Sequence, residues 1–394
     1  MAGLKRTADS TLAKKVNTVV VVDAVRKYSP LSRAEVAKLT MLSPSTVSGI
    51  VSDLVRAGLV RETKGDAGSA GGRRPILLTL NAGAALAAII DVQVARILYG
   101  IVDLAGSPVC VMKEDVDLSS PAGTVDQVLR AAARALAKMP RAGAGAAAGI
   151  GVGVPGVVDS RTGTILKSTR LRWTNLPLAA RLQREFGLPV LVERDVRAAA
   201  WGERRYGHAR NVTDFVYMAV GEGGFGAALV VNGKPYMGAR MHAGELGHMT
   251  VDMHGERCSC GNIGCLAGVA SASIQAWKGG KGEGAERDLV EYTATGLVNL
   301  VNLLDPELVV LGGDIGGRPD FGSRVEAAAK ERALLAPDQM PRVLPSQLGD
   351  MAVALGLAGL VFDRFYWNHT PADDLPEMGE GGMTGHRVQA RSGL

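Results

Sequence analysis

The same order of elements is predicted twice in the larger, C-terminal part of the chain, and this repetition constrains the fold more than any other feature. Each cycle has two apolar strands, a helix, and a further buried strand that ends at glycine. The predicted members are 87–92, 97–103, 124–138 and 148–154 in the first cycle, and 215–220, 226–231, 285–304 and 308–311 in the second. We expect the first two strands to form a hairpin with Asp103–Gly106 as its turn. Two similar α/β lobes are therefore predicted, with ligands held at the carboxyl ends of the strands.

The 394-residue chain carries its positive charge in the first 80 residues. These residues hold 13 Lys and Arg against 6 Asp and Glu, whereas the remainder holds 31 against 33. A basic head on a nearly neutral body indicates a polyanionic partner for the head alone, although a solvated basic face would have the same charge. No segment has the length and apolar character of a membrane span, and the N-terminus does not resemble a signal peptide.

Three helices and a hairpin are predicted in the head, with the helices at 16–28, 33–39 and 44–56. Ser32 and Glu35 have the spacing of a capping box for the second helix. Ser43 followed by Pro44 gives the third helix an N-cap and a proline in its first turn. The second and third helices form a helix-turn-helix, and the segments 58–60 and 76–80 form a two-stranded wing.

The outer face of the third helix begins with short hydroxyl residues, which can approach phosphates and base edges without clashing. The arm of the wing carries two arginines suited to phosphates or a narrow minor groove. The candidate DNA contacts are Ser43, Ser45, Thr46, Ser48, Arg73 and Arg74. We therefore predict a winged helix-turn-helix DNA-binding domain over residues 1–80. The alternative is a helical dimerisation module whose arginines are only solvated.

Three of the four cysteines, Cys258, Cys260 and Cys265, fall within eight positions, and His248 precedes them. This density indicates a metal site in a reducing compartment, and hence a cytoplasmic protein, rather than a disulfide framework. Three thiolates and one imidazole form a closed tetrahedral set, so structural zinc is predicted. The alternative is three small buried cysteines, but a glycine-rich loop offers them little core to fill. Cys110 stands alone, and we expect it in the core.

Several motifs together resemble the repressor branch of the ROK family, which contains repressors, open reading frames and sugar kinases. The most specific are His242-Ala-Gly-Glu-Leu-Gly-His248 and Cys258-Ser-Cys260-Gly-Asn-Ile-Gly-Cys265-Leu, with support from Gly151-Val-Gly-Val-Pro-Gly156, Val192-Glu-Arg-Asp195 and Val310-Leu-Gly-Gly313. The resemblance extends from Gly72-Arg73-Arg74-Pro75 to about Phe365. It implies an α/β protein in which the winged helix-turn-helix precedes a two-lobed, actin-like body of the sugar kinase and ribonuclease H type over residues 81–370. Residues 371–394 lack periodicity and are predicted to be a flexible tail.

The resemblance also implies which residues contact a ligand. In the family's kinases an aspartate that matches Asp195 is the general base on a sugar hydroxyl, and residues that match Glu245 and His248 hold other hydroxyls. His248 would thus serve both zinc and ligand. The family's asparagine is Arg194 here, which could prefer a phosphate or carboxylate, and a family glutamate is Ala267. We expect a sugar or sugar derivative at Arg194, Asp195, Glu245 and His248; the alternative is a cleft that binds nothing.

Phosphoryl transfer requires backbone amides around the nucleotide phosphates. The family's first phosphate loop, Asp-x-Gly-Gly/Ala-Thr, is Asp91-Val-Gln93-Val-Ala95 here, and its second, Gly-Thr-Gly, is Gly221-Glu222-Gly223. Gln93 replaces a glycine, and Glu222 would repel phosphate. We therefore expect a regulator without kinase activity, in which Asp195 is a vestigial base. The alternatives are a sugar kinase with an accessory DNA-binding head and a constitutive DNA-binding protein whose body only dimerises.

The predicted regulator is a transcriptional repressor that acts as a homodimer or homotetramer. Two recognition helices in successive major grooves imply an operator with an inverted repeat. A sugar or sugar derivative bound in the body would change the spacing or orientation of the two heads, and with it the affinity for DNA.

Overall fold

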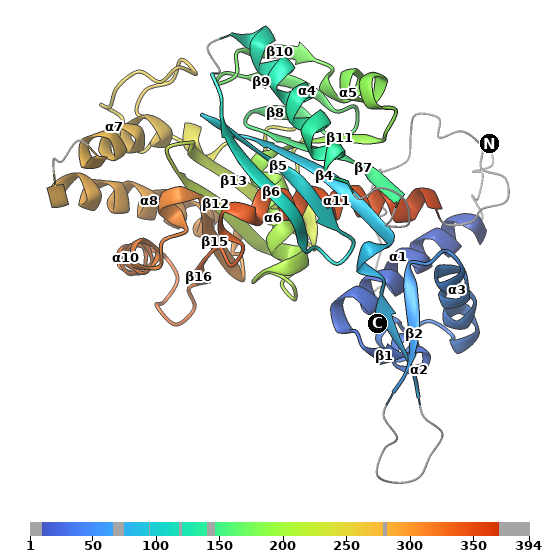
Figure 1. Cartoon of the computed structure of the whole chain (residues 1–394). Coiled ribbons are helices and arrows are strands. Elements are labelled where there is room, and N and C mark those ends of the chain that lie inside the picture. The colour runs from blue at the N-terminus through green and yellow to red at the C-terminus, as the bar shows by residue number, and fades with distance from the viewer. Residues whose placement is uncertain are drawn as a thin grey trace, which may run out of the picture. The chain divides into compact units, whose positions relative to one another are not determined.

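The computed structural model describes residues 10–65, 75–93, 95–117, 120–139, 146–278 and 282–369. The chain divides into two compact units at the boundary between Thr79 and Leu80. The first unit, the head, extends to Thr79 and also includes the chain from Tyr366, and the second, the body, is Leu80–Phe365. Figure 1 labels the elements of both units.

The head contains three helices and a small sheet whose strand order is β1-β3-β2. Its elements are α1 (Ser10–Tyr28), β1 (Leu31–Ser32), α2 (Arg33–Thr40), α3 (Pro44–Arg56), β2 (Val60–Lys64) and β3 (Ile76–Leu80). The three helices lie where the sequence predicted them, although α1 begins earlier, at Ser10. Of the two later strands, β3 lies at the predicted 76–80, whereas β2 lies at Val60–Lys64 and not at 58–60. The sheet has a third strand that was not predicted, because β1 is only two residues long and has no pattern of its own.

Side chains cap the second and third helices of the head as predicted. The Ser32 hydroxyl accepts the Glu35 amide at 3.3 Å, and Glu35 Oε2 accepts the Ser32 amide at 2.7 Å. The Ser43 hydroxyl accepts the Thr46 amide at 3.2 Å at the start of α3. Each cap satisfies a backbone donor that the helix itself leaves without a partner. The buried face of α1 differs from the predicted one, since Val16 and Val20 are 46% and 40% exposed.

The body contains two five-stranded sheets with the same topology (Figure 1). The strand order is β11-β7-β4-β5-β6 in the first lobe and β14-β13-β12-β15-β16 in the second. In each sheet the first three strands along the chain are antiparallel neighbours, and the last two are added in parallel. The predicted pair of similar α/β lobes is confirmed.

The first lobe has several elements that the sequence analysis did not predict, among them the edge strand of its sheet. Its elements are β4 (Ala85–Val92), β5 (Arg96–Asp103), β6 (Pro108–Asp115), α4 (Pro121–Ala137), β7 (Ala146–Val154), β8 (Val157–Asp159), β9 (Thr164–Ser168), β10 (Trp173–Leu176), α5 (Leu178–Phe186) and β11 (Val190–Arg194). The turn Asp103–Gly106 joins β5 to β6 and does not close the β4–β5 hairpin, so that prediction was wrong. β6 was not predicted because it is a half-exposed edge strand without a continuous apolar run. Cys110 lies on β6 and is only partly buried against the core.

The second lobe repeats the pattern with more helices. Its elements are β12 (Phe215–Gly221), β13 (Gly224–Val231), β14 (Lys234–Tyr236), η2 (Leu246–His248), α7 (Leu266–Lys278), α8 (Gly282–Leu304), β15 (Leu308–Gly312), α9 (Gly313–Gly316), α10 (Pro319–Lys330) and β16 (Arg342–Pro345). Two further helices, α6 (Asp195–Tyr206) and α11 (Ala352–His369), pack against both lobes.

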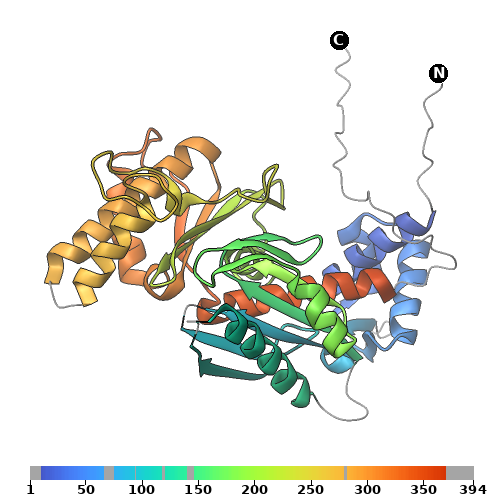
Figure 2. The same ribbon diagram turned by 90° about the horizontal axis from the view of Figure 1, so that it is seen from above.

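Glycines allow α11 to lie directly on β7 and on α6. A Cβ at Gly153 of β7 would lie 2.8 Å from Val353 of α11, and one at Gly356 would lie 1.7 Å from the Ala198 carbonyl oxygen of α6. Figure 2 shows α11 as the red helix beside the strands of the first lobe. The alternating glycines of β7 thus lie in a strand, where they allow close packing against α11, and do not form a loop.

Residues of the predicted ligand site and of the predicted phosphate loops lie at or near the carboxyl ends of strands in both lobes. Asp91 is near the end of β4, Arg194 ends β11, Gly221 ends β12 and Gly312 ends β15. In sheets of this type, ligands bind at the carboxyl ends of the strands. None of the helices in the described ranges has the length and apolar character needed to cross a bilayer.

Candidate functional site

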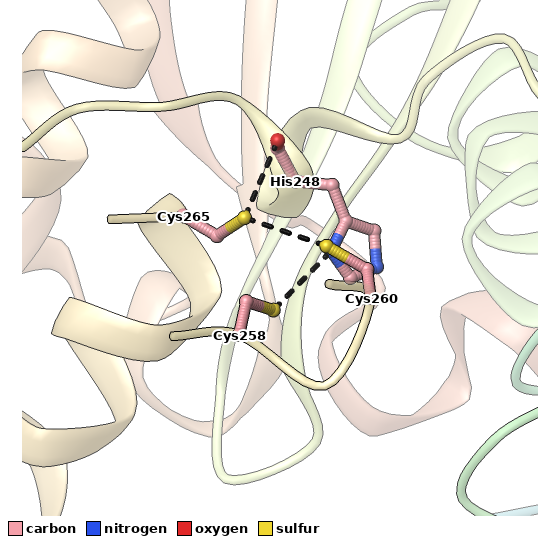
Figure 3. A group of neighbouring side chains, drawn as sticks. All are labelled: His248, Cys258, Cys260 and Cys265. Carbon is pink, nitrogen blue, oxygen red and sulfur yellow. Dashed lines mark hydrogen bonds between the residues drawn. The ribbon is translucent and has the colours of Figure 1, made fainter. Parts of the chain in front are cut away.

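The four predicted metal ligands lie together between β14 and α7 (Figure 3). Cys258, Cys260 and Cys265 face the imidazole of His248, and one ligand atom from each of the four lies within 4.8 Å of the others. His248 ends the short helix η2, and Cys265 immediately precedes α7. The loop that carries the cysteines is therefore anchored at both sides of the cluster.

The spacing of these atoms fits a tetrahedral metal ion. Cys258 Sγ lies 3.7 Å from His248 Nδ1, and Cys260 Sγ lies 3.6 Å from Cys265 Sγ. Ligand atoms around zinc, at bond lengths of about 2.3 Å to sulfur and about 2.0 Å to nitrogen, are about 3.5–3.8 Å apart. Two of the pairs have such separations and all four atoms lie within 4.8 Å of one another, so the set could hold zinc, which would cross-link the loop.

His248 also faces the predicted ligand residues. Its Nδ1 points to the thiols, while its Nε2 lies 4.0 Å from Glu245 Oε2. Glu245 Oε1 pairs with Arg194 Nη1 at 3.0 Å, and the same guanidinium donates to the Ala243 carbonyl at 3.3 Å. A carboxylate beside the second nitrogen of a metal-binding imidazole commonly orients the ring. In the structure, Glu245 therefore lies between His248 and Arg194.

A buried network fixes the turn that presents Arg194 and Asp195. Glu193 Oε1 accepts the Arg194 amide at 2.6 Å and the Arg197 Nε–H at 2.7 Å. Glu193 Oε2 accepts the Ser160 hydroxyl at 2.8 Å. The side chains of Glu193 and Arg197 are only 8% and 3% exposed, so the pair depends on its hydrogen bonds to offset desolvation. The network positions the first turn of α6, from which Asp195 extends.

Asp195 completes the set of predicted ligand residues at this end of the sheet. Its Oδ1 accepts the Val196 amide at 2.7 Å. Burial raises the pKa of Asp195, while the charge of Arg194 and the Val196 hydrogen bond oppose that rise. Ala267 lies against the same loop, because a Cβ at Gly247 would be 3.2 Å from the Ala267 Cβ. Guanidinium donors and carboxylate acceptors in this arrangement suit a ligand with several hydroxyl groups.

The turn that matches the family's second phosphate loop already has an internal partner. The Glu222 amide, between β12 and β13, donates to Asp314 Oδ1 at 3.1 Å. The same carboxylate oxygen lies so near Gly221 that a Cβ there would be 1.7 Å away. From the other side, Arg170 Nη1 donates to the Glu222 carbonyl at 3.4 Å. The turn is thus held by a side chain from each lobe.

The first phosphate loop is also occupied by the chain's own groups. Gln93 Nε2 donates to Asp91 Oδ2 at 2.8 Å. Asp91 is 2% exposed, and burial raises its pKa to about 7, against the hydrogen bond from Gln93 and with smaller contributions from the charges of Asp195 and Asp350. A buried carboxyl group whose pKa is raised and which already accepts a hydrogen bond is a weaker partner for the cation of a nucleotide than an exposed aspartate.

The predicted DNA contacts of α3 lie at its N-terminal end. Ser45 and Ser48 are exposed, and Thr46 is half-buried beside the Ser43 cap. Ser48 Oγ accepts from Arg33 Nη1 at 2.9 Å, so this hydroxyl braces α3 against α2. Arg73 and Arg74 lie outside the described residues.

Sequence reasoning missed several residues of these sites. Asp314 follows Gly312-Gly313 directly, and its acidic side chain beside a glycine turn was a usable signal. Arg170 gave no signal, because it lies 52 residues from Glu222 in the chain and only the fold brings them together. The role of Glu193 and Arg197 follows from their burial, which no local pattern predicts.

The paired actin-like lobes and the site between their strand ends define the fold of sugar kinases and related proteins. A family model described as the ROK family matches residues 89–364. This chain belongs to the ROK family, so the resemblance inferred from the sequence is confirmed.

Individual relatives agree with this assignment. The chain is 31% identical over 379 residues to a xylose repressor of Bacillus spizizenii, which covers 91% of this chain and 98% of that protein. A crystal structure of a ROK family transcriptional regulator, a homologue of the Escherichia coli MLC protein, has the same fold, with a TM-score of 0.75, 23% identity and coverage of 90% of this chain and 97% of that one. A ROK family glucokinase from Streptomyces griseus, in complex with glucose and AMPPNP, matches with a TM-score of 0.59, 27% identity and coverage of 70% of this chain and 98% of that one.

Removal of one thiol should test the metal site. We expect the purified chain to hold one zinc ion per chain and Cys260→Ser to lose it, because three ligands bind zinc far more weakly than four. Elemental analysis by mass spectrometry measures the stoichiometry, and Cys110→Ser, outside the cluster, is the matched control. Full zinc content in the Cys260 variant would reject this ligand set.

Burial of Asp91 should make the stability of the body depend on pH. Its pKa is raised to about 7, so the folded state prefers the neutral form. The stability contributed by that form is fully present below pH 4 and is lost as pH rises through 7, a change on the order of 4 kcal/mol. Asp91→Asn should therefore raise the melting temperature more at pH 8 than at pH 5, whereas the exposed Asp338→Asn should not. An equal shift at both pH values would contradict a neutral Asp91.

Proposed function

We propose that this protein is a transcriptional repressor in which residues 1–80 bind operator DNA and residues 81–370 bind a sugar or sugar derivative that controls the DNA affinity. The main observation behind the proposal is the hydrogen bond from the Glu222 amide to Asp314 Oδ1, at 3.1 Å. A kinase would need this amide to bind a nucleotide phosphate. The similarity to a repressor over 91% of the chain supports the same conclusion.

A sugar kinase with an accessory DNA-binding head is the second candidate. Asp195 and the likeness to a glucokinase favour it. Against it stand the hydrogen bond from Gln93 to Asp91 and the engaged Glu222 amide, since each takes up a group that a kinase would need for a triphosphate or its cation. A general base without a bound phosphoryl donor performs no transfer.

Control of DNA binding would follow from ligand contacts that both lobes share. Arg194 comes from the first lobe and Glu245 from the loop of the second, so a ligand on both would change how the lobes are held. A homodimer would pass this change to two heads on an inverted repeat. The zinc loop would give Glu245 a firm support, since His248 lies between it and the thiols.

Selection of bound duplexes from a random pool, followed by fluorescence anisotropy with a panel of sugars, tests this function. We expect the full chain to select an inverted repeat and one class of sugar to change the operator affinity by roughly 5–150-fold, which corresponds to a coupling of about 1–3 kcal/mol. Failure to enrich any duplex would reject the repressor. If no sugar changes the operator affinity, sugar control is rejected and a constitutive DNA-binding protein is the remaining alternative.

The arm of the wing should contribute through phosphate contacts. The double variant Arg73→Ala, Arg74→Ala should bind the operator more weakly and lower the slope of log affinity against log salt by about 2, since each phosphate contact contributes about 0.9. Arg161→Ala with Arg172→Ala, two exposed arginines of the body, is the control. A slope unchanged by the first pair would remove the arm from the DNA interface.

A further inference from the structure

We infer that the effector carries an anionic group, a phosphate ester or a carboxylate, and that Arg170 is the residue that recognises it. The inference rests on the proposed function, because it concerns the same ligand site. Arg170 lies between β9 and β10, away from the motifs that resemble the family's ligand residues.

The two guanidinium groups near Asp195 differ in how their charges are balanced. Arg194 is buried and pairs with Glu245 at 3.0 Å. Arg170 is exposed, and none of the carboxylates in the described ranges forms an ion pair with it. Its one hydrogen bond to a described residue goes to the Glu222 carbonyl, at the long distance of 3.4 Å. A guanidinium has five donors, so most of its capacity is left for a ligand.

The position of Arg170 places those donors beside the ligand residues. Its charge lowers the pKa of Asp195, which puts it on the Asp195 side of the site. Its Nη2 lies 2.5 Å from the position of a Cβ at Gly224, so the group rests over the β12–β13 turn. No atom lies within 4 Å of a Cβ position at Gly223, so the turn leaves open space there. A charged substituent on the ligand carbon nearest Asp195 would therefore meet Arg170.

Neighbouring acids do not cancel this attraction. Burial raises the pKa of Asp195, while the charges of Arg194 and Arg170 oppose that rise. Glu222 is exposed, so water and salt screen its charge as they screen that of Arg170, and direct contact with the guanidinium then decides where an anion binds. A polyphosphate laid on the turn itself would meet the Glu222 side chain and the engaged amide, whereas a single anionic group on the Asp195 side meets the guanidinium first.

Paired ligands and one substitution test the inference on the full chain. The probes for calorimetric titration are glucose, N-acetylglucosamine and xylose, the phosphate esters glucose 6-phosphate, N-acetylglucosamine 6-phosphate and xylose 5-phosphate, and the acids gluconate and glucuronate. We expect at least one charged form to bind about 10–100-fold more tightly than its parent sugar, as charge-assisted hydrogen bonds allow. Arg170→Gln should bring that ratio close to one, with the affinity for the parent sugar unchanged, and Arg172→Gln, the exposed arginine two residues along, should leave the ratio intact.

The outcomes separate this inference from the proposed function. Preference for an ester or for an acid identifies which anionic group is recognised. A parent sugar that binds as tightly as its charged forms, or a ratio that Arg170→Gln leaves intact, overturns the inference while operator binding still supports the repressor. Absence of operator binding rejects the repressor whatever the sugars do.

Discussion

The proposed function of the body depends on the hydrogen bond from the Glu222 amide to the Asp314 carboxylate. A backbone amide at such a turn binds phosphate only when it is free, and here a carboxylate of the same chain occupies it. In the other phosphate loop, the Gln93 side-chain amide donates to the Asp91 carboxylate. Because each loop has an internal hydrogen-bond partner, we propose that the two lobes retain the architecture of a sugar kinase without its means of holding a triphosphate.

The predicted ligand residues, in contrast, are held in place by several hydrogen bonds. Glu193 and Arg197, both buried, hold the turn that carries Arg194 and Asp195. His248 stands between the cluster of thiols and Glu245, so the metal loop and the ligand loop share one imidazole. The proposed sensor would use such a site to change the relation of the two lobes on ligand binding without chemistry.

Much of the fold could be predicted from the sequence because local signals were strong. Ser32, Glu35 and Ser43 marked the helix starts of the head, and apolar runs marked the central strands of both lobes. The edge strand β6 and the short strand β1 lacked such signals, since exposed or very short strands have no apolar run. The cluster of His248 and three cysteines was recognisable by spacing, whereas Arg170 and Asp314 act on a turn that is distant in the chain, which only the tertiary fold shows.

Direct binding of nucleotide tests the central claim. Isothermal titration of the full chain with AMPPNP and magnesium, with and without a sugar that alters operator binding, measures whether the phosphate loops still accept a triphosphate. The account predicts no saturable heat at millimolar nucleotide in either condition. Saturable binding, together with release of ADP from ATP in the presence of that sugar, would contradict it and identify the body as a working kinase.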